Sequence, residues 1–267
     1  MKKYSIIFIG LISILTFYSF NTNNNRADEL LKELGIPAAA ARSYIWRTFI
    51  GESFSFPSNS NFRNYPQDKR ATAVQVIGGY VKDYLTSIDF AKQYQQFREE
   101  RKPRSPLSVE DRVKMEIHNL NLSLKDAQDG FRKANPELKS IYEASIKKYK
   151  QSINAFENDY DPQHPAQMEG ILTQYDYDMS DYRFRLKQFE REYPADVKLF
   201  IRNRLQDFLL LSSTVDFNAK LIQQSGAKKF ANPSYEAKPN AWKYCFLAGK
   251  ESTSAARRLA AQWIKEI

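Results

Sequence analysis

Hydrophobic residues recur along this chain at alternating steps of three and four positions, which is the spacing of one face of an α-helix. Five long segments follow this pattern, and they cover residues 66–102, 107–134, 136–160, 165–193 and 195–224. Shorter helices are expected at residues 27–34, 37–50 and 249–266. No alternating run of β-branched residues lies between turn residues, so we expect no sheet larger than a hairpin.

The eleven prolines lie between these periodic segments or in their first turns. Proline costs about 3 kcal/mol inside a helix but is tolerated in the first turn, so the prolines indicate where helices begin and end. Short links such as Asn135-Pro136 favour antiparallel neighbours. The sequence therefore predicts an all-α fold, an elongated up-down antiparallel helical bundle of about five long helices plus short terminal helices.

These helices are expected to form a single helical-bundle domain over residues 26–267, and the alternative divides the chain near Pro103 to Pro106. The helix predicted at 195–224 is apolar on all sides near its middle, which favours a central position, and Gly226 is its expected stop. The C-terminal helix is expected to dock on the bundle through a small, alanine-rich face, with a membrane surface as the alternative.

The first 25 residues have the layout of an export signal. Lys2 and Lys3 precede an uninterrupted apolar run over residues 4–20, and a polar, asparagine-rich tether follows. We expect export to the periplasm or the cell exterior, with cleavage near residues 19–25. The alternative is an uncleaved membrane anchor, because a run of this length is at the lower limit for crossing a bilayer.

Cysteine, histidine and glycine usage excludes several classes of site. The chain has one cysteine, Cys245, which excludes an internal disulfide and a four-cysteine zinc site, and we expect its thiol to be buried and inert. Two histidines make a histidine-rich metal centre improbable. The nine glycines do not have the spacing of a phosphate-binding loop. We therefore expect no cofactor.

The formal net charge of +9 is distributed unevenly. Residues 157–181 carry seven acids and no Lys or Arg, whereas residues 228–267 carry eight basic and three acidic side chains. Because an exported protein is separated from nucleic acid, we expect no nucleic-acid partner. The basic end favours an anionic glycan, a lipid headgroup or another envelope protein as the partner.

Closely spaced carboxylates at Asp176, Asp178 and Asp181 are candidate calcium ligands. An EF-hand loop needs glycine at its sixth position and glutamate at its twelfth, and this segment has Asp181 and Lys187 there. We therefore favour a solvated acidic face that lies against basic residues of a neighbouring helix. Glu52 is the candidate catalytic carboxylate, although Glu52-Ser53 is similar to the acid–serine pair of lytic transglycosylases in that dipeptide alone.

Two aromatic segments, residues 51–65 and 225–248, are the candidate binding surface. Their candidate binding residues are Phe54, Phe56, Phe62, Tyr65, Tyr235, Lys238, Trp242 and Lys243. In the second segment we expect Trp242 and Phe246 to pack on the bundle, and Tyr235 with the neighbouring lysines to face outward. The alternative is that the aromatic residues only close the end of the bundle.

The leading interpretation of these features is an exported, non-enzymatic binding or scaffold protein of the cell envelope. One alternative is an envelope enzyme that acts on glycan or peptide with a carboxylate such as Glu52 as acid/base. Another is a structural protein tethered to the membrane by its N-terminal run.

Overall fold

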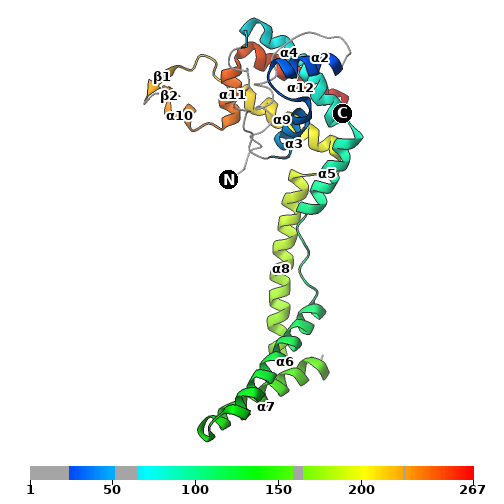
Figure 1. Ribbon diagram of the computed structural model, residues 1–267, viewed down its shortest axis with the longest axis vertical. Helices are drawn as coiled ribbons and strands as arrows, with labels where there is room; N and C mark the ends of the chain where they lie inside the picture. The colour runs from blue at the N-terminus through cyan, green and yellow to red at the C-terminus, as the bar shows by residue number, and fades with distance from the viewer. Residues whose placement is uncertain (1–23, 52–64, 159–164, 225–226) are drawn as a thin grey trace. The chain divides into compact units, whose positions relative to one another are not determined.

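The computed structural model describes residues 24–51, 65–158, 165–224 and 227–267. Within these residues the protein is predominantly helical, which confirms the all-α prediction, and its sheet is a two-stranded hairpin (Figure 1). The chain divides into two compact units. Unit 1 consists of the described residues up to Glu100 together with Glu192–Ile267, and unit 2 is Arg101–Arg191.

Unit 1 contains most of the secondary-structure elements. Its longer helices are α2 (Asn24–Glu33), α3 (Ala38–Ile50), α4 (Arg70–Leu85), α5 (Ile88–Arg101), α9 (Val197–Ser213), α11 (Asn240–Ala248) and α12 (Lys250–Glu266). Shorter elements are the 3₁₀ turn η2 (Gln67–Lys69), the strands β1 (Leu221–Gln224) and β2 (Ala227–Phe230), and α10 (Pro233–Glu236). The helices predicted near residues 27–34, 37–50 and 249–266 are confirmed as α2, α3 and α12.

The core of unit 1 is aromatic where α5 meets α9. The rings of Tyr94 and Phe200 are buried and stack with their centroids 4.4 Å apart. The guanidinium of Arg204 lies over the Phe200 ring at 5.0 Å from its centroid, and its Nε donates to the carbonyl of Phe49 at 3.0 Å. A buried positive charge thus has both an aromatic face and a carbonyl oxygen as partners, and the end of α3 is held against α9.

The segment that leads into α9 is held by side chains of α5. The Tyr94 hydroxyl donates to the carbonyl of Pro194 at 2.8 Å, and Arg98 Nε donates to the carbonyl of Tyr193 at 2.8 Å. The hydroxyl of Tyr193 in turn donates to the carbonyl of Ile50 at 3.0 Å. These bonds satisfy backbone groups of a connecting segment that lies next to the core.

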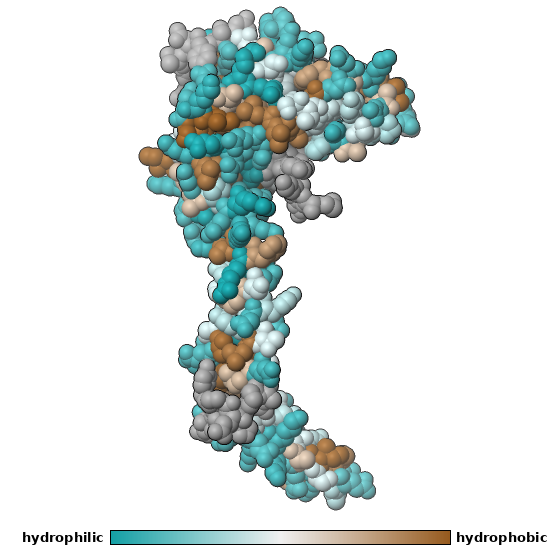
Figure 2. Space-filling view, turned by 180° about the vertical axis from the view of Figure 1, so that it is seen from behind, coloured by the Kyte–Doolittle hydropathy of each residue, from teal (hydrophilic) through white to brown (hydrophobic). Residues whose placement is uncertain are grey.

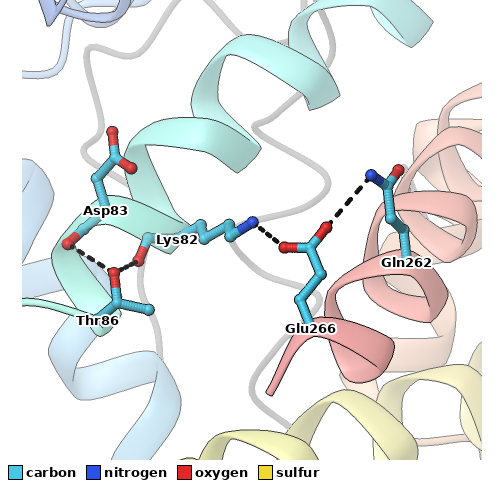
Figure 3. Close-up of polar contacts among 5 residues, drawn as sticks. All are labelled: Lys82, Asp83, Thr86, Gln262 and Glu266. Atoms are coloured by element: carbon cyan, nitrogen blue, oxygen red, sulfur yellow. Dashed lines mark hydrogen bonds and ion pairs between the residues drawn. The ribbon is translucent and has the colours of Figure 1, made fainter.

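Helix α12 docks on α4 and α9, as its alanine-rich face predicts. Ala256, Ala260 and Trp263 are buried, and Leu259 comes so close to Gly78 of α4 that a β-carbon there would clash with it. At the edge of this contact Lys82 of α4 pairs with Glu266 of α12 (Figure 3). The pair is partly solvent-exposed, so the apolar contact supplies most of the stabilisation.

The single helix predicted over residues 66–102 is instead two helices, α4 and α5, which are separated at Thr86 and Ser87. The Thr86 hydroxyl donates to the carbonyl of Lys82 at 2.8 Å. The Ser87 hydroxyl donates to the carbonyl of Tyr84 at 2.6 Å and accepts the N–H of Phe90 at 3.1 Å. These hydroxyls bond to backbone groups at the break and start a new helix there.

The helix predicted over residues 195–224 is also wrong in its length, because α9 ends at Ser213. Asp216 accepts the N–H of Asn218 at 2.9 Å, which forms a turn in place of a further helical turn. The chain then enters the hairpin, in which Leu221 lies opposite Phe230 and Ile222 opposite Lys229. Gly226, the expected helix stop, lies outside the described residues.

Unit 2 is built from three long helices, α6 (Val109–Lys133), α7 (Pro136–Asn158) and α8 (Pro165–Glu192), close to their predicted bounds. The hydroxyl of Ser108 accepts the N–H of Asp111 at 3.0 Å and caps α6. Helices α6 and α7 pack along each other and are joined by Ala134 and Asn135, so they form an antiparallel hairpin. The Tyr142 ring lies so close to Gly130 that a β-carbon there would clash with it.

The helices of unit 2 bury few side chains. Among their described residues Ala127 of α6 and Ile153 of α7 are buried, and every side chain of α8 keeps at least partial exposure. Figure 2 shows hydrophobic patches between hydrophilic side chains on this part of the surface. The apolar seams of these helices are therefore only half covered within the unit.

The described residues bear on only part of the predicted domain division. Unit 2 begins at Arg101, close to the alternative division near Pro103, and the single domain over residues 26–267 stays a prediction. Residues 1–23 lie outside the described residues, so the export signal also stays a prediction. None of the described helices combines the length and the hydropathy that crossing a membrane requires.

Leu205→Ala is expected to lower the free energy of unfolding by about 2–5 kcal/mol, because this side chain of α9 is 0% exposed. Leu210→Ala is the matched control on the same helix. It removes the same atoms from a side chain that is 66% exposed, so we expect a change within about 0.5 kcal/mol. Urea unfolding followed by circular dichroism measures both values. Equal losses would show that α9 buries a different face.

Candidate binding surface

Trp242 of α11 is the centre of an aromatic cluster in unit 1. Trp242 is 1% exposed, and its Nε1 donates to the carbonyl of Thr214 at 2.9 Å. The rings of Tyr235 and Phe246 stack on it with centroids 5.1 and 6.2 Å away, and Phe230 meets it edge-on at 5.6 Å. The cluster holds β2, α10 and α11 against the segment that follows α9.

Two carboxylates hold the polar edge of this cluster. The Tyr235 hydroxyl donates to Asp216 at 2.9 Å, and this hydrogen bond raises the pKa of Tyr235. Glu236 accepts the Lys243 ammonium at 2.9 Å and the N–H of Phe230 at 2.6 Å. These two bonds, the one from Lys243 first, lower the pKa of Glu236.

The hairpin next to the cluster has two different faces. Side chains alternate along a strand, so Leu221 and Phe230 lie on one face, and Ile222 and Lys229 on the other. Phe230 is buried in the aromatic cluster, so the second face points away from it. Ile222 is 47% exposed. An aliphatic side chain is thus presented to solvent beside a lysine.

A second lysine lies on the same face. The N–H of Ala231 donates to the carbonyl of Lys220 at 2.8 Å, which continues the strand pairing by one residue. By the alternation of side chains, Lys220 therefore shares a face with Ile222 and Lys229. We call Lys220, Ile222 and Lys229 the hairpin face.

The surroundings of the hairpin face are positively charged. Residues 214–249 carry five lysines and two acids, and both acids are bound within the cluster, Asp216 by Tyr235 and Glu236 by Lys243. Lys228 and Lys238 are exposed, as are both lysines of the hairpin face. Four exposed ammonium groups therefore lie on this part of the chain.

The structure brings together part of the predicted site. Trp242 is packed as expected, and Tyr235 and Lys243 lie beside it. Tyr235, which is predicted to face outward, keeps partial exposure, and its ring also stacks on Trp242. The predicted outward lysines are exposed except Lys243, which is partly buried and paired with Glu236.

The first aromatic segment is described only at its end. Glu52, Phe54, Phe56 and Phe62 lie outside the described residues. Tyr65 is partly buried against the core, and its carbonyl accepts both Nε and Nη2 of Arg70, at 3.2 and 3.0 Å. The described part of this segment therefore belongs to the packing at the start of α4.

The acidic residues of α8 are held in part by arginines. Arg112 of α6 donates to Asp178 at 2.7 Å, which lowers the pKa of Asp178, and Arg185 pairs with Asp181 at 2.7 Å. Asp176 is exposed. Among the described residues, no group of three His, Cys, Asp or Glu side chains converges as a metal ion requires.

A polar hollow of about 410 Å³ lies elsewhere in unit 1, between α2, α3, α4 and the start of α5. Its charged lining consists of Asp28, Arg42, Asp83 and Asp89, and Arg42 pairs with Asp89 at 3.9 Å. Burial raises the pKa of Tyr84, which also lines the hollow. Three carboxylates against one guanidinium suit a cationic small molecule better than an anionic one.

The thiol of Cys245 is buried under α12. Burial raises the pKa of Cys245 to about 12, and its carbonyl accepts the hydroxyl of Thr253 at 3.0 Å. A buried thiol with a raised pKa stays protonated and is a poor nucleophile.

Comparison of this chain with models of protein families, with curated proteins and with solved structures finds no match. The chemistry of the hairpin face therefore rests on its own residues. The sequence reasoning missed Lys220 and Ile222, which were assigned to a helix. The turn dipeptide Ser225-Gly226, between two short segments with apolar residues, is the signal that indicates a hairpin there.

Trp242→Ala is expected to lower the free energy of unfolding by about 3–5 kcal/mol, because it removes the centre of the aromatic cluster and its bond to Thr214. Lys238→Ala, at an exposed position nearby, is the control and is expected to change stability by less than about 0.5 kcal/mol. Chemical denaturation measures both variants. An unfolding transition that Trp242→Ala leaves unmoved would mean that the cluster is not part of the folded core.

Glu236→Gln is expected to destabilise the protein at neutral pH but not in acid. The folded protein lowers the pKa of Glu236 below its ordinary value of 4.5, so the ionised carboxylate stabilises the fold above that pH. This contribution is lost as the pH falls through the lowered pKa. Urea unfolding of wild type and variant across this range tests the difference, with Glu29→Gln as an exposed control in α2. A pH-independent gap between wild type and Glu236→Gln contradicts the prediction.

Proposed function

We propose that this chain is an exported, non-enzymatic binding protein of the cell envelope, and that the hairpin face attaches it to an anionic lipid surface. The observation that carries the proposal is an exposed isoleucine, Ile222, between Lys220 and Lys229 on one face of β1–β2. The apolar run over residues 4–20 supports export.

The combination of residue types favours lipid over other anionic ligands. A lysine near an anionic membrane surface contributes about 1 kcal/mol, and burying one isoleucine among acyl chains contributes roughly 1.5–3 kcal/mol. The sum supports a reversible attachment that depends on both charge and an apolar side chain.

An anionic glycan is the less favoured ligand. Sugar rings are bound by exposed aromatic faces, and the rings of Trp242 and Tyr235 stack on each other instead. The exposed aliphatic side chain of Ile222 offers no hydrogen bond to a sugar hydroxyl.

We also propose the elongated up-down arrangement that the sequence predicts for about five long helices, of which α6 and α7 are one antiparallel pair. The two-residue link between α6 and α7 supports antiparallel neighbours. The half-covered seams of these helices support a scaffold role for unit 2.

The triple variant Lys220→Gln/Lys228→Gln/Lys229→Gln is expected to bind vesicles of phosphatidylcholine and phosphatidylglycerol about tenfold or more weakly than wild type. Ile222→Ser is expected to weaken binding without a change of charge. Neither wild type nor variant should bind phosphatidylcholine alone. Vesicle co-sedimentation measures all of these affinities.

The matched control neutralises three exposed lysines of α7, with Lys147, Lys148 and Lys150 changed to Gln. It carries the same change of net charge and should keep most of the vesicle binding. An equal loss in this control would show that net charge alone drives binding and would overturn the proposal. If the chain instead binds an anionic polysaccharide, and this binding requires the hairpin lysines but not Ile222, the ligand of the hairpin face is a glycan and not a lipid.

A further inference from the structure

Helix α8 carries a regularly spaced apolar seam that the described residues cover only in part. The seam residues follow steps of four and three, the heptad spacing of a coiled coil, and are Met168, Leu172, Tyr175, Met179, Tyr182, Leu186 and Phe189. Within the described part of α8 none of them is buried, and Leu172 is 43% exposed. The seam is about 32 Å long at 1.5 Å per residue. A stripe of this length is typical of a helix that packs on a further helix.

One edge of the seam is occupied and the other is open. Arg112 of α6 pairs with Asp178 at 2.7 Å and lies 5.7 Å from the centroid of the Tyr175 ring, so the start of α6 lies against that edge. The opposite edge carries Asp176 and Arg183, which are exposed. Within the described part of the chain neither of these two side chains forms an ion pair. A partner helix therefore has access from the side of Asp176 and Arg183.

The seam has two rows of different size. One row is aliphatic and consists of Leu172, Met179 and Leu186. The other is mostly aromatic and consists of Met168, Tyr175, Tyr182 and Phe189. In a pair of helices, each level of the seam brings together one residue from each copy. If two copies of α8 pair antiparallel, every such layer combines a residue of the aliphatic row with a residue of the other row, so Met179 faces Tyr182 of the second copy. In a parallel pair each layer joins identical residues, and thick aromatic layers alternate with thin aliphatic ones. Antiparallel pairing thus fills the layers evenly.

The charges at the open edge agree with this orientation. When Met179 faces Tyr182 of the second copy, Asp176 and Arg183 lie along the same edge of the pair, and Asp176 of each copy is within two positions of the level of Arg183 of the other. The acidic half of the helix then lies along the basic half of its partner. Glu169 of one copy and Glu190 of the other come close at the ends of the pair. A substitution that removes this like-charge contact distinguishes an antiparallel from a parallel pair.

We propose that α8 forms an antiparallel pair with α8 of a second copy of this chain, through its apolar seam and two Asp176–Arg183 ion pairs. This inference is independent of lipid binding, since it rests on unit 2 and not on the hairpin face. The purified full chain is expected to form a reversible dimer in sedimentation velocity experiments.

A charge-exchange series tests the pairing. Asp176→Arg alone and Arg183→Asp alone each place like charges opposite each other twice, so each is expected to raise the dimer dissociation constant about tenfold. The double variant Asp176→Arg/Arg183→Asp restores both pairs and should dimerise like wild type. An equimolar mixture of the two single variants should also recover association, because only the mixed dimer has complementary charges at both places.

Two further variants separate orientation from net charge. Arg191→Asp, an exposed position turned away from the seam, is the control and should leave the dimer unchanged. Glu190→Lys should strengthen an antiparallel dimer, because it then faces Glu169, but weaken a parallel one, where it faces Arg185. A chain that is monomeric at all concentrations, or single variants that do not rescue each other on mixing, would overturn the proposal.

Discussion

A helix with an apolar stripe is stable in water only when another surface covers that stripe, and this constraint separates the two units. In unit 1, one face of α9 is covered, and its residues Phe200, Leu205 and Phe208 are buried. In unit 2, α6 and α7 cover part of each other, whereas α8 keeps its stripe half exposed. The first unit can therefore hold a fixed surface such as the hairpin, and the second has a face left for a partner.

The two proposals are independent of each other, and together they have a physical consequence. One hairpin face has two lysines and one isoleucine, which supports weak and reversible attachment to lipid. A dimer formed through α8 carries two such faces. When both reach the same surface, the second attachment becomes intramolecular, and the overall affinity rises without any new kind of contact.

Most helices could be predicted from the sequence because their apolar spacing and their prolines act locally. The two helices whose bounds were predicted wrongly are interrupted by hydrogen bonds from side chains to the backbone. At Thr86 and Ser87, hydroxyl groups compete for backbone partners and divide a continuous seam into two helices. After Ser213, the turn at Asp216 ends a helix whose apolar spacing continues. Hydrophobic periodicity carries no information about such side-chain bonds.

The sequence by itself determined the helical class, the spacing of the α8 seam, the basic C-terminal end and the burial of Trp242, because each follows from composition or from positions close along the chain. Only the tertiary structure decided that Tyr235 packs on Trp242, that Glu236 holds Lys243, and that Ile222 is left exposed beside two lysines. The physical reason is that strand pairing and ring packing join residues from separate elements, and their partners are set by the fold as a whole.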